Sequence, residues 1–284
     1  MMTPLNYRYY VRGHWAGPPD EKPAVIGAKF LQTLDALSGI DLLFTGWQFT
    51  GYWQIPEERR SEFVPLAVGR KRIAEIVESG VYVDDFNQPE DGYSVFAVAG
   101  PRGPRHVSFT VSTTDQHFKL SFGEHDLASD LSIVRYPLFK AALLAISSAW
   151  DAQWSCAQAF RNDVVKVPIN FGGVSAFRMD SPIQVPLDPT FPKSIFHIPW
   201  FSYLSAKCAA GVAPTRDVFT ERTPDGGTLM TATEDRLDPG NPEHVRRARV
   251  IAETMIARTS RQPGRVKPVS KKVANHERRP GSTR

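Results

Sequence analysis

An apolar stripe between Pro23 and Gly39 is the clearest periodic pattern in the first half of the chain. Its members recur at spacings of three and four residues, which is the period of an amphipathic helix: Ile26, Phe30, Leu34 and Leu37. Proline is favoured at the first position of a helix, and glycine commonly follows the last one. The pattern therefore predicts a helix that begins at Pro23 and ends at Gly39.

Alternation of apolar and polar residues with period two marks three segments further along, at 93–98, 107–111 and 118–122. Such a segment buries one face and leaves the other in water, and glycine, proline or polar turns separate these three. The arrangement predicts an antiparallel meander. The string Tyr-Arg-Tyr-Tyr-Val-Arg within residues 6–12 is β-prone by composition and predicts a first strand.

Less regular patterns fill the rest of the first half. The aromatic stretch at 42–53 predicts a strand and a turn, and apolar residues behind a basic triplet predict a shorter helix within 70–80. Carboxylates dominate the next stretch, 84–92, which also contains proline and glycine. We expect an acidic loop there.

The second half begins with an apolar stripe at 137–150 that predicts a helix, after which we expect the chain to return to the sheet at 156–160. Prolines recur between 164 and 199, and this segment is expected to form an irregular wrap over the core or short edge strands. Two β-prone runs, 218–222 and 228–233, then flank Pro-Asp-Gly-Gly, which is a strong hairpin signal.

A last apolar stripe predicts a helix from Asn241, a favoured N-cap residue, to about Ile256. Together these elements predict an α+β fold with a mostly antiparallel sheet and about four flanking helices. A chain of 284 residues, 42% of them hydrophobic, is long enough to bury one large core. We therefore expect a single domain over residues 1–260, followed by a tail at 261–284.

The net charge of +4 conceals an asymmetry between the body and the tail. Residues 261–284 hold eight Lys and Arg against one acid, Glu277, so the body keeps 26 of the 34 bases and 29 of the 30 acids. The tail also contains prolines and has no apolar period, which predicts disorder. Its cations attract nucleic-acid phosphates, and we expect no nucleic-acid contact from the rest of the chain.

Cysteine content and hydropathy indicate the compartment. Cys156 and Cys208 lie among apolar or small residues without a Cys or His neighbour at metal-ligand spacing, so we expect buried, reduced thiols. The first residues lack the basic and apolar regions of a signal peptide, and no apolar run approaches the roughly 18 residues that a membrane helix needs. We expect a cytoplasmic protein without a membrane partner.

The motifs of common enzymes and cofactor sites are absent from the sequence: GxSxG, the Walker loop, GxGxxG and HExxH. Glu-x-Lys, which restriction-type nucleases use beside a metal-binding acid, does not occur either. His117 and His125 lie near three acids in a cluster that either binds a metal weakly or belongs to a polar loop: Asp115, Glu124 and Asp126. We predict no metal, no cofactor and no catalytic residue.

Aromatic side chains are the other candidates for function, since Trp and Tyr anchor many protein interfaces. Most of the tryptophans nevertheless lie inside or beside apolar runs. We therefore expect four of them to pack in the core: Trp47, Trp53, Trp150 and Trp154.

Several short motifs occur in an order that points to a known family. They are Leu-Ser-Gly-Ile-Asp at a helix end, Phe44-Thr-Gly-Trp47, Trp150-Asp-Ala-Gln-Trp154, Pro199-Trp200-Phe-Ser-Tyr203-Leu-Ser205, Gly-Gly-Thr at 226–228, Thr233-Glu234 and Asn241-Pro-Glu-His244. In these motifs the chain resembles the immunity protein 52 family of bacterial toxin systems, over most of residues 6 to 258. The resemblance implies an immunity protein without catalytic residues, which binds and neutralises a restriction-endonuclease-like toxin inside the producing cell.

A toxin-binding role requires a contact surface. An inhibitor of a nuclease competes with nucleic acid for a basic cleft, and clustered carboxylates suit that task. The first candidates are therefore the acids of the loop, Asp84, Asp85, Glu90 and Asp91, and the next is the aromatic segment 200–205 with Trp200 and Tyr203. Two alternatives stay open: an unrecognised enzyme, and a structural or nucleic-acid-associated protein that uses the basic tail.

The tail yields the first prediction. Because residues 263–284 lack the apolar period that packing requires, deleting them should leave the melting temperature nearly unchanged. Differential scanning fluorimetry of the full and truncated chains measures this. A loss of many degrees would mean that the tail packs on the body.

Overall fold

The computed structural model describes residues 7–18, 21–51, 63–83, 89–114, 116–123, 129–161, 168–171, 174–177, 198–210, 212, 216–238 and 240–259. Within these ranges the helical segments are α1 (Pro23–Ser38), the 3-10 turns η1 (Leu42–Phe44) and η3 (Arg70–Arg72), α2 (Leu66–Gly69), α3 (Ile73–Glu78), α4 (Tyr136–Ala149), α5 (Ala206–Ala209) and α6 (Pro242–Thr259). The strands of the first half are β1 (Tyr7–Trp15), β2 (Gln48–Gly51), β3 (Val64–Pro65), β4 (Val81–Val83), β5 (Pro89–Ala99), β6 (Val107–Ser112) and β7 (His117–Phe122). Those of the second half are β8 (Ala152–Arg161), β9 (Pro168–Phe171), β10 (Val174–Phe177), β11 (Ile198–Leu204), β12 (Phe219–Arg222) and β13 (Thr228–Thr231).

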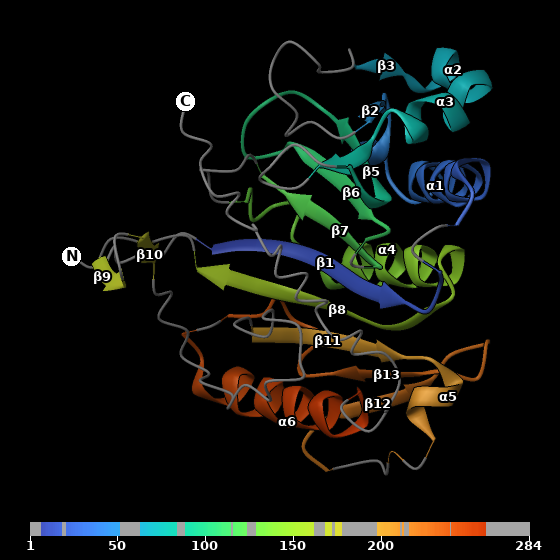
Figure 1. The fold of residues 1–284 in the computed structure, drawn as a ribbon. Coiled ribbons are helices and arrows are strands. Elements are labelled where there is room, and N and C mark those ends of the chain that lie inside the picture. The colour runs from blue at the N-terminus through green and yellow to red at the C-terminus, as the bar shows by residue number, and fades with distance from the viewer. Residues whose placement is uncertain are drawn as a thin grey trace, which may run out of the picture.

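One antiparallel sheet organises the described residues (Figure 1). Its order is β12-β13-β11-β8-β1-β7-β6-β5-β2-β3, with β4 paired to β5, while β9 and β10 form a separate two-stranded pair. The first strand of the chain thus lies in the middle, between β7 and β8. Because one sheet contains both the first and the last described strands, β1 and β13, the fold is a single α+β domain, as predicted.

The predicted meander is confirmed as β5, β6 and β7, whose registers pair each strand with the next. The predicted hairpin is confirmed as β12 and β13, which are joined by a turn in which Gly226 has a φ of 81°. Positive φ is the conformation that glycine adopts without steric cost, so the turn chemistry explains the hairpin.

Two helices lie against one face of the sheet and on each other. The four stripe residues of α1 are fully buried, and α1 ends at Gly39 as predicted. Phe30 of α1 stacks on Phe109 with ring centroids 5.5 Å apart, and Phe139 of α4 stacks on Phe122 at 4.2 Å. These contacts form a continuous aromatic layer between helices and strands.

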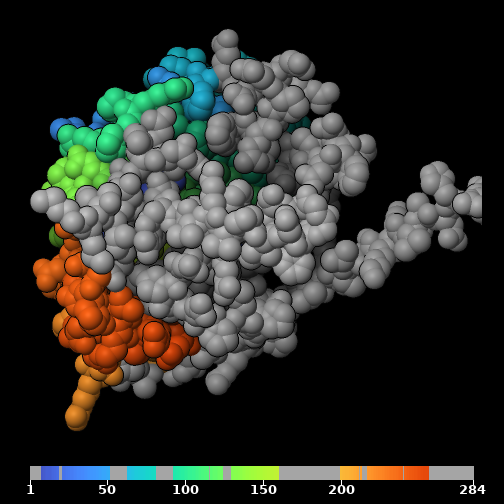
Figure 2. Space-filling model, turned by 90° about the vertical axis from the view of Figure 1, so that its left-hand side faces the viewer, coloured from blue at the N-terminus to red at the C-terminus, as the bar shows by residue number. Residues whose placement is uncertain are grey.

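At the other end of the sheet, α6 packs along β11 and β13. Figure 2 shows this helix, in orange-red, as a continuous surface at the lower part of the side view. Its inward residues are buried: Ala248, Ile251, Ala252 and Met255. The apolar stripe read from the sequence is therefore the packing face of α6.

Trp150 ties the two central helices together. It follows α4, is completely buried, and its indole N–H donates a 2.9 Å hydrogen bond to the Thr33 hydroxyl of α1. Its ring also packs 4.6 Å from that of Trp15. The core positions predicted for Trp47, Trp150 and Trp154 are confirmed, and Trp53 lies outside the described residues.

The turn and the strand expected within 42–53 are both present, as η1 and β2, and local capping explains where the turn lies. The Asp41 carboxylate accepts a 2.9 Å hydrogen bond from the Leu43 N–H and caps the 3-10 turn η1. An Asp side chain that binds a backbone N–H two residues on favours a turn over a strand. The strand therefore begins only at Gln48.

Two further expectations are corrected by strand pairing. The loop expected at 84–92 is wrong for residues 89–92, which belong to β5 because Val83 pairs with Pro89 and Val81 with Tyr93. The proline-rich segment contains the short strands β9 and β10, in agreement with one of the two expected alternatives, but it ends in β11, an interior strand of the large sheet in which the register shifts between Pro199 and Phe201. A bulge accommodates the missing proline donor, so the proline does not prevent pairing.

Close packing leaves no room for a side chain at Gly13, near the end of β1. A Cβ atom there would lie 2.7 Å from the Ser155 Cβ and 2.7 Å from the Trp154 carbonyl oxygen, and would overlap the Phe118 ring. Two of these neighbours are backbone or Cβ atoms of the adjoining strand and cannot rotate away. Glycine is therefore required by space at this position.

The Trp150 contact generates a stability prediction. Trp150→Ala should lower the free energy of unfolding by about 3–5 kcal/mol, because it opens a cavity beside Trp15. Thr33→Val should cost less, about 1–3 kcal/mol, because it only leaves the buried indole N–H without an acceptor. Urea denaturation followed by circular dichroism measures both, with Leu42→Ala at an exposed position as the control. Equal effects of all three substitutions would contradict the assignment.

Candidate functional site

The acidic candidates are only partly described. Asp84 and Asp85 lie outside the described residues, and Glu90 and Asp91 are described through their backbone, as the second and third residues of β5. Their role as a partner contact therefore stays a prediction.

The aromatic candidates lie in the core. Trp200 is fully buried, and its indole N–H donates a 2.9 Å hydrogen bond to the Thr233 carbonyl. Tyr203 is 4% exposed, and its hydroxyl donates a 2.6 Å hydrogen bond to the Asp225 carboxylate. Both side chains are thus used to hold β11 to the residues around the β12–β13 hairpin, and neither presents its ring at the surface.

Asp225 organises that hairpin turn. Burial by itself raises the pKa of its carboxyl, but hydrogen bonds from Thr223, Tyr203 and the Gly227 N–H outweigh burial and lower it. Burial and then Asp225 itself raise the pKa of the Tyr203 hydroxyl. Tyr203 therefore keeps its proton and acts as a permanent hydrogen-bond donor.

No reactive arrangement is found among the described residues of the two thiols and of the cluster of histidines and acids around His117. Cys156 and Cys208 are buried and form no disulfide, and burial raises the pKa of the Cys156 thiol to about 12. His125 and its neighbouring acids lie outside the described residues, and the described part of the chain holds no group of three or more metal-ligand side chains. No described helix is long and apolar enough to span a membrane.

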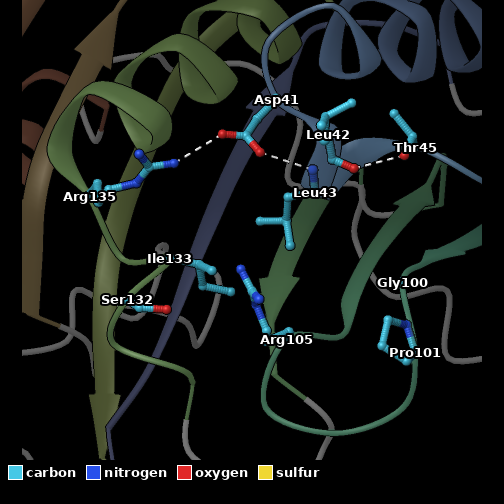
Figure 3. A pocket seen from close by; sticks show the side chains of 10 residues that line it. All are labelled: Asp41, Leu42, Leu43, Thr45, Gly100, Pro101, Arg105, Ser132, Ile133 and Arg135. Atoms are coloured by element: carbon cyan, nitrogen blue, oxygen red, sulfur yellow. Dashed lines mark hydrogen bonds and ion pairs between the residues drawn. The ribbon is translucent and has the colours of Figure 1, made fainter.

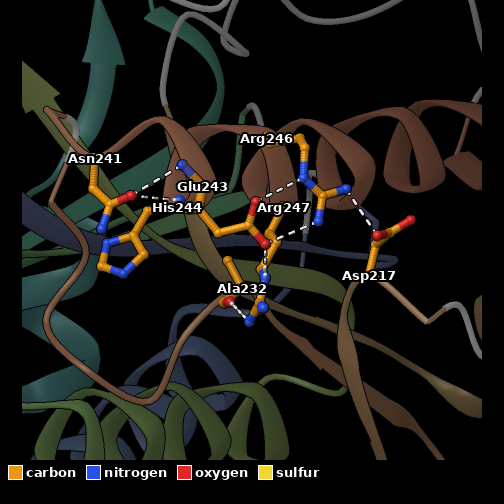
Figure 4. A network of polar contacts seen from close by, with 7 residues as sticks. All are labelled: Asp217, Ala232, Asn241, Glu243, His244, Arg246 and Arg247. Carbon is orange, nitrogen blue, oxygen red and sulfur yellow. Dashed lines mark hydrogen bonds and ion pairs between the residues drawn. The ribbon is translucent and has the colours of Figure 1, made fainter.

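A polar network at the start of α6 is structural (Figure 4). The Asn241 carboxamide caps the helix by accepting from the Glu243 N–H at 2.9 Å, as predicted. Glu243 accepts from Arg246 and Arg247, and Arg246 also binds Asp217 at 2.8 Å. The network joins α6 to Asp217, two residues ahead of β12, and its carboxylates are occupied by its own arginines.

A surface pocket lies among the described residues (Figure 3). It has a volume of about 550 Å³ and lies between three segments that are far apart in sequence. These are η1 with its flanking residues, the turn between β5 and β6, and the residues that precede α4. Its lining comprises Asp41, Leu42, Leu43, Thr45, Gly100, Pro101, Arg105, Ser132, Ile133 and Arg135.

Two aspartates hold two arginines at this pocket. Asp41 uses one carboxylate oxygen to cap η1 and the other to bind Arg135 at 3.0 Å. Asp130 likewise accepts from the Ser132 N–H at 2.9 Å, and its other oxygen lies 3.5 Å from the Arg105 Nε. Hydrogen bonds from Ser132 lower the pKa of the Asp130 carboxyl, and the Arg105 charge adds to them. Each carboxylate thus orients one guanidinium.

Apolar side chains complete the pocket. Ile133 is buried and Leu43 is partly buried, and they form its apolar wall. Leu42, which also lines the pocket, is 86% exposed. An exposed leucine in the same lining as two arginines gives a surface that mixes apolar contact area with charged donors.

Sequence reasoning missed this pocket because its parts are distant in the chain. The available signal was Asp41 ahead of an apolar run, which indicates an N-cap and a turn. The strand and turn expected within 42–53 were not assigned to particular residues, so the exposure of Leu42 was not predicted. The other two segments become neighbours only through the order of the sheet.

No family model and no curated protein matches this chain. Among solved structures, a similar one is the T6SS protein PA0821 of Pseudomonas aeruginosa, with 13% sequence identity and a TM-score of 0.47. The match covers 88% of this chain and 73% of that one. At this level the likeness assigns neither a residue nor an activity to the present chain.

The α6 network generates a pH prediction. Hydrogen bonds from Arg246 and then Arg247 lower the pKa of Glu243 to about 2, below its ordinary value of 4.5. A carboxyl whose pKa is depressed by folding stabilises the fold above its unfolded pKa and loses that effect as the pH falls through the folded pKa. Glu243→Gln should therefore lower the melting temperature at pH 6 and have little effect near pH 2.

The control is Glu253→Gln, which changes an exposed acid on the same helix. Thermal unfolding at pH 6, 4 and 2 compares the two variants with the unmodified chain. Because Glu243 is exposed, the expected shift is small, a few degrees at most. A Glu243→Gln deficit that stays constant down to pH 2 would contradict the assigned pKa.

Proposed function

We propose that this chain is an immunity-type protein that binds and neutralises a cognate toxin protein. The observation that carries the proposal is the pocket surface, where the exposed Leu42 lies in the same lining as Arg105 and Arg135. Apolar side chains exposed next to charged ones are typical of surfaces that bind other proteins, and arginine is enriched in such interfaces.

The motifs that resemble the immunity protein 52 family support this proposal through the fold. Trp47, Trp150 and Trp154 are core residues, and Trp200 and Tyr203 hold the β11 region together. The motifs thus specify the fold, and the fold in turn presents the surface through which an inhibitor would bind its target. The nuclease activity of the toxin is part of the same proposal, and it rests on the resemblance alone.

The acidic residues remain a proposed contact within this function. Asp84, Asp85, Glu90 and Asp91 would face a basic cleft of a nuclease and accelerate its encounter with the inhibitor. An unrecognised enzyme, or a nucleic-acid-associated protein that acts through its basic tail, is the alternative function.

The proposal predicts protection and complex formation. Cells that express the toxin encoded beside this gene should survive when they also express this chain, and the two proteins should co-purify through size-exclusion chromatography. The matched control is a toxin of the same class from a different gene pair, which should kill the cells and elute separately. A neighbouring toxin that kills despite equal expression of this chain, and that does not co-purify with it, would refute the proposed function.

A further inference from the structure

The pocket carries an inference about the contact surface itself. We infer that the surface formed by η1, the β5–β6 turn and the residues before α4 binds an acidic segment of the toxin, with a carboxylate on Arg105 and Arg135 and with Leu42 inserted into an apolar depression of the toxin. This inference rests on the proposed toxin-binding function and assigns it to a place on the fold.

The arginines have donors left for a partner. A guanidinium offers five N–H groups, and the contacts of Arg105 and Arg135 at the pocket each engage one nitrogen. Arg105 binds Asp130 through Nε, so both of its terminal nitrogens remain for a carboxylate, which can accept two parallel hydrogen bonds from them. Both arginine side chains are about 60% exposed, at 62% and 59%.

The two arginines are also preoriented. Asp41 and Asp130 are each anchored by a backbone N–H and are themselves only 30% and 29% exposed. Holding a long side chain in one direction before binding removes part of the entropy cost of the complex. The aspartates therefore act as supports for the arginines, and they leave the outward N–H groups in water.

Charge decides in favour of an acidic partner segment. Asp41 and Asp130 balance Arg135 and Arg105, and the exposed Arg102 of the same β5–β6 turn leaves one positive charge in excess. A carboxylate that enters the pocket meets this excess charge and the remaining arginine N–H donors, whereas the two aspartates already hold arginines and leave less for a basic side chain. Complementary charges also direct the encounter and fix the register of the two surfaces.

Leu42 favours a protein as the partner over a small anion or a nucleic acid. Leu42 is 86% exposed at the mouth of the pocket, so an anion held within the cavity would leave its side chain in water. Nucleic-acid backbones offer phosphates but few apolar depressions for a leucine. A protein surface provides both a carboxylate and an apolar depression.

Site-directed labelling tests this surface directly. Because Cys156 and Cys208 are buried, Leu42→Cys introduces a single exposed thiol into the full-length chain. A maleimide dye should label this thiol quickly in the free protein. The neighbouring toxin, in a catalytically inactive form, should slow the labelling about tenfold or more, because the core of a protein interface excludes water.

The matched control is Val68→Cys on α2, at a valine that is 62% exposed and lies outside the pocket lining. Its labelling should not change when the toxin binds. Unchanged labelling of Leu42→Cys in a complex that still forms would overturn the inference and leave the proposed function intact. Absence of any complex would overturn both.

Other occupants give distinct results in the same assay. Protection of Leu42→Cys without toxin, increasing with protein concentration, would identify a second copy of this chain. Protection by a DNA duplex would identify nucleic acid. Either result would overturn the assignment to an acidic toxin segment.

Binding kinetics supply the second measurement. Arg105→Gln with Arg135→Gln should slow association and reduce its salt dependence, because exposed charges act mainly on the encounter. Leu42→Asp should weaken the affinity about tenfold or more, chiefly through faster dissociation. Arg72→Gln is the matched control, since Arg72 is 64% exposed and also holds one ion pair.

The acidic candidates are tested in the same binding measurements. Asp84, Asp85, Glu90 and Asp91, all changed to Lys, form the competing variant. If that variant loses binding while the pocket variants bind like the unmodified chain, the acidic residues are the interface and the inference is wrong.

Discussion

The aromatic layer between the sheet and the helices α1 and α4 is the contact on which the other features depend. Phe139 stacks on Phe122 at 4.2 Å, and Trp150 donates to Thr33 and so fixes one helix to the other. Fixing these helices also fixes what lies at their ends. The residue before α4 is Arg135, and the turn after α1 begins at Asp41, so the layer brings the two halves of this ion pair together. The pocket is thus a product of core packing.

Much of the fold followed from periodicity. The stripe of α1, the alternation of β5, β6 and β7, and the glycines of the β12–β13 turn each specify an element through local physics. Pairing between distant residues did not follow. The register that draws Pro89 into β5 and the bulge at Pro199 depend on neighbouring strands, which the local sequence does not contain.

The candidate site was less predictable than the fold. Trp200 and Tyr203 were chosen because aromatic residues anchor interfaces. The large apolar surface of such side chains also favours burial in the core, and in this fold both are buried. The strand and turn expected within 42–53 left the position of Leu42 open. The hydrogen bond from the Leu43 N–H to the Asp41 carboxylate forms the turn in which Leu42 is exposed to water.

The division of η1 between core and surface has a consequence for diversification. Phe44 belongs to the aromatic layer, whereas the exposed Leu42 and the β5–β6 turn contribute surface, so these two can change while the tryptophans of the motifs stay fixed. Under the proposed function, two chains that share every motif could then bind different partner proteins. Similarity of their cores would indicate common descent, and the residue at position 42 and the β5–β6 turn would differ with the partner.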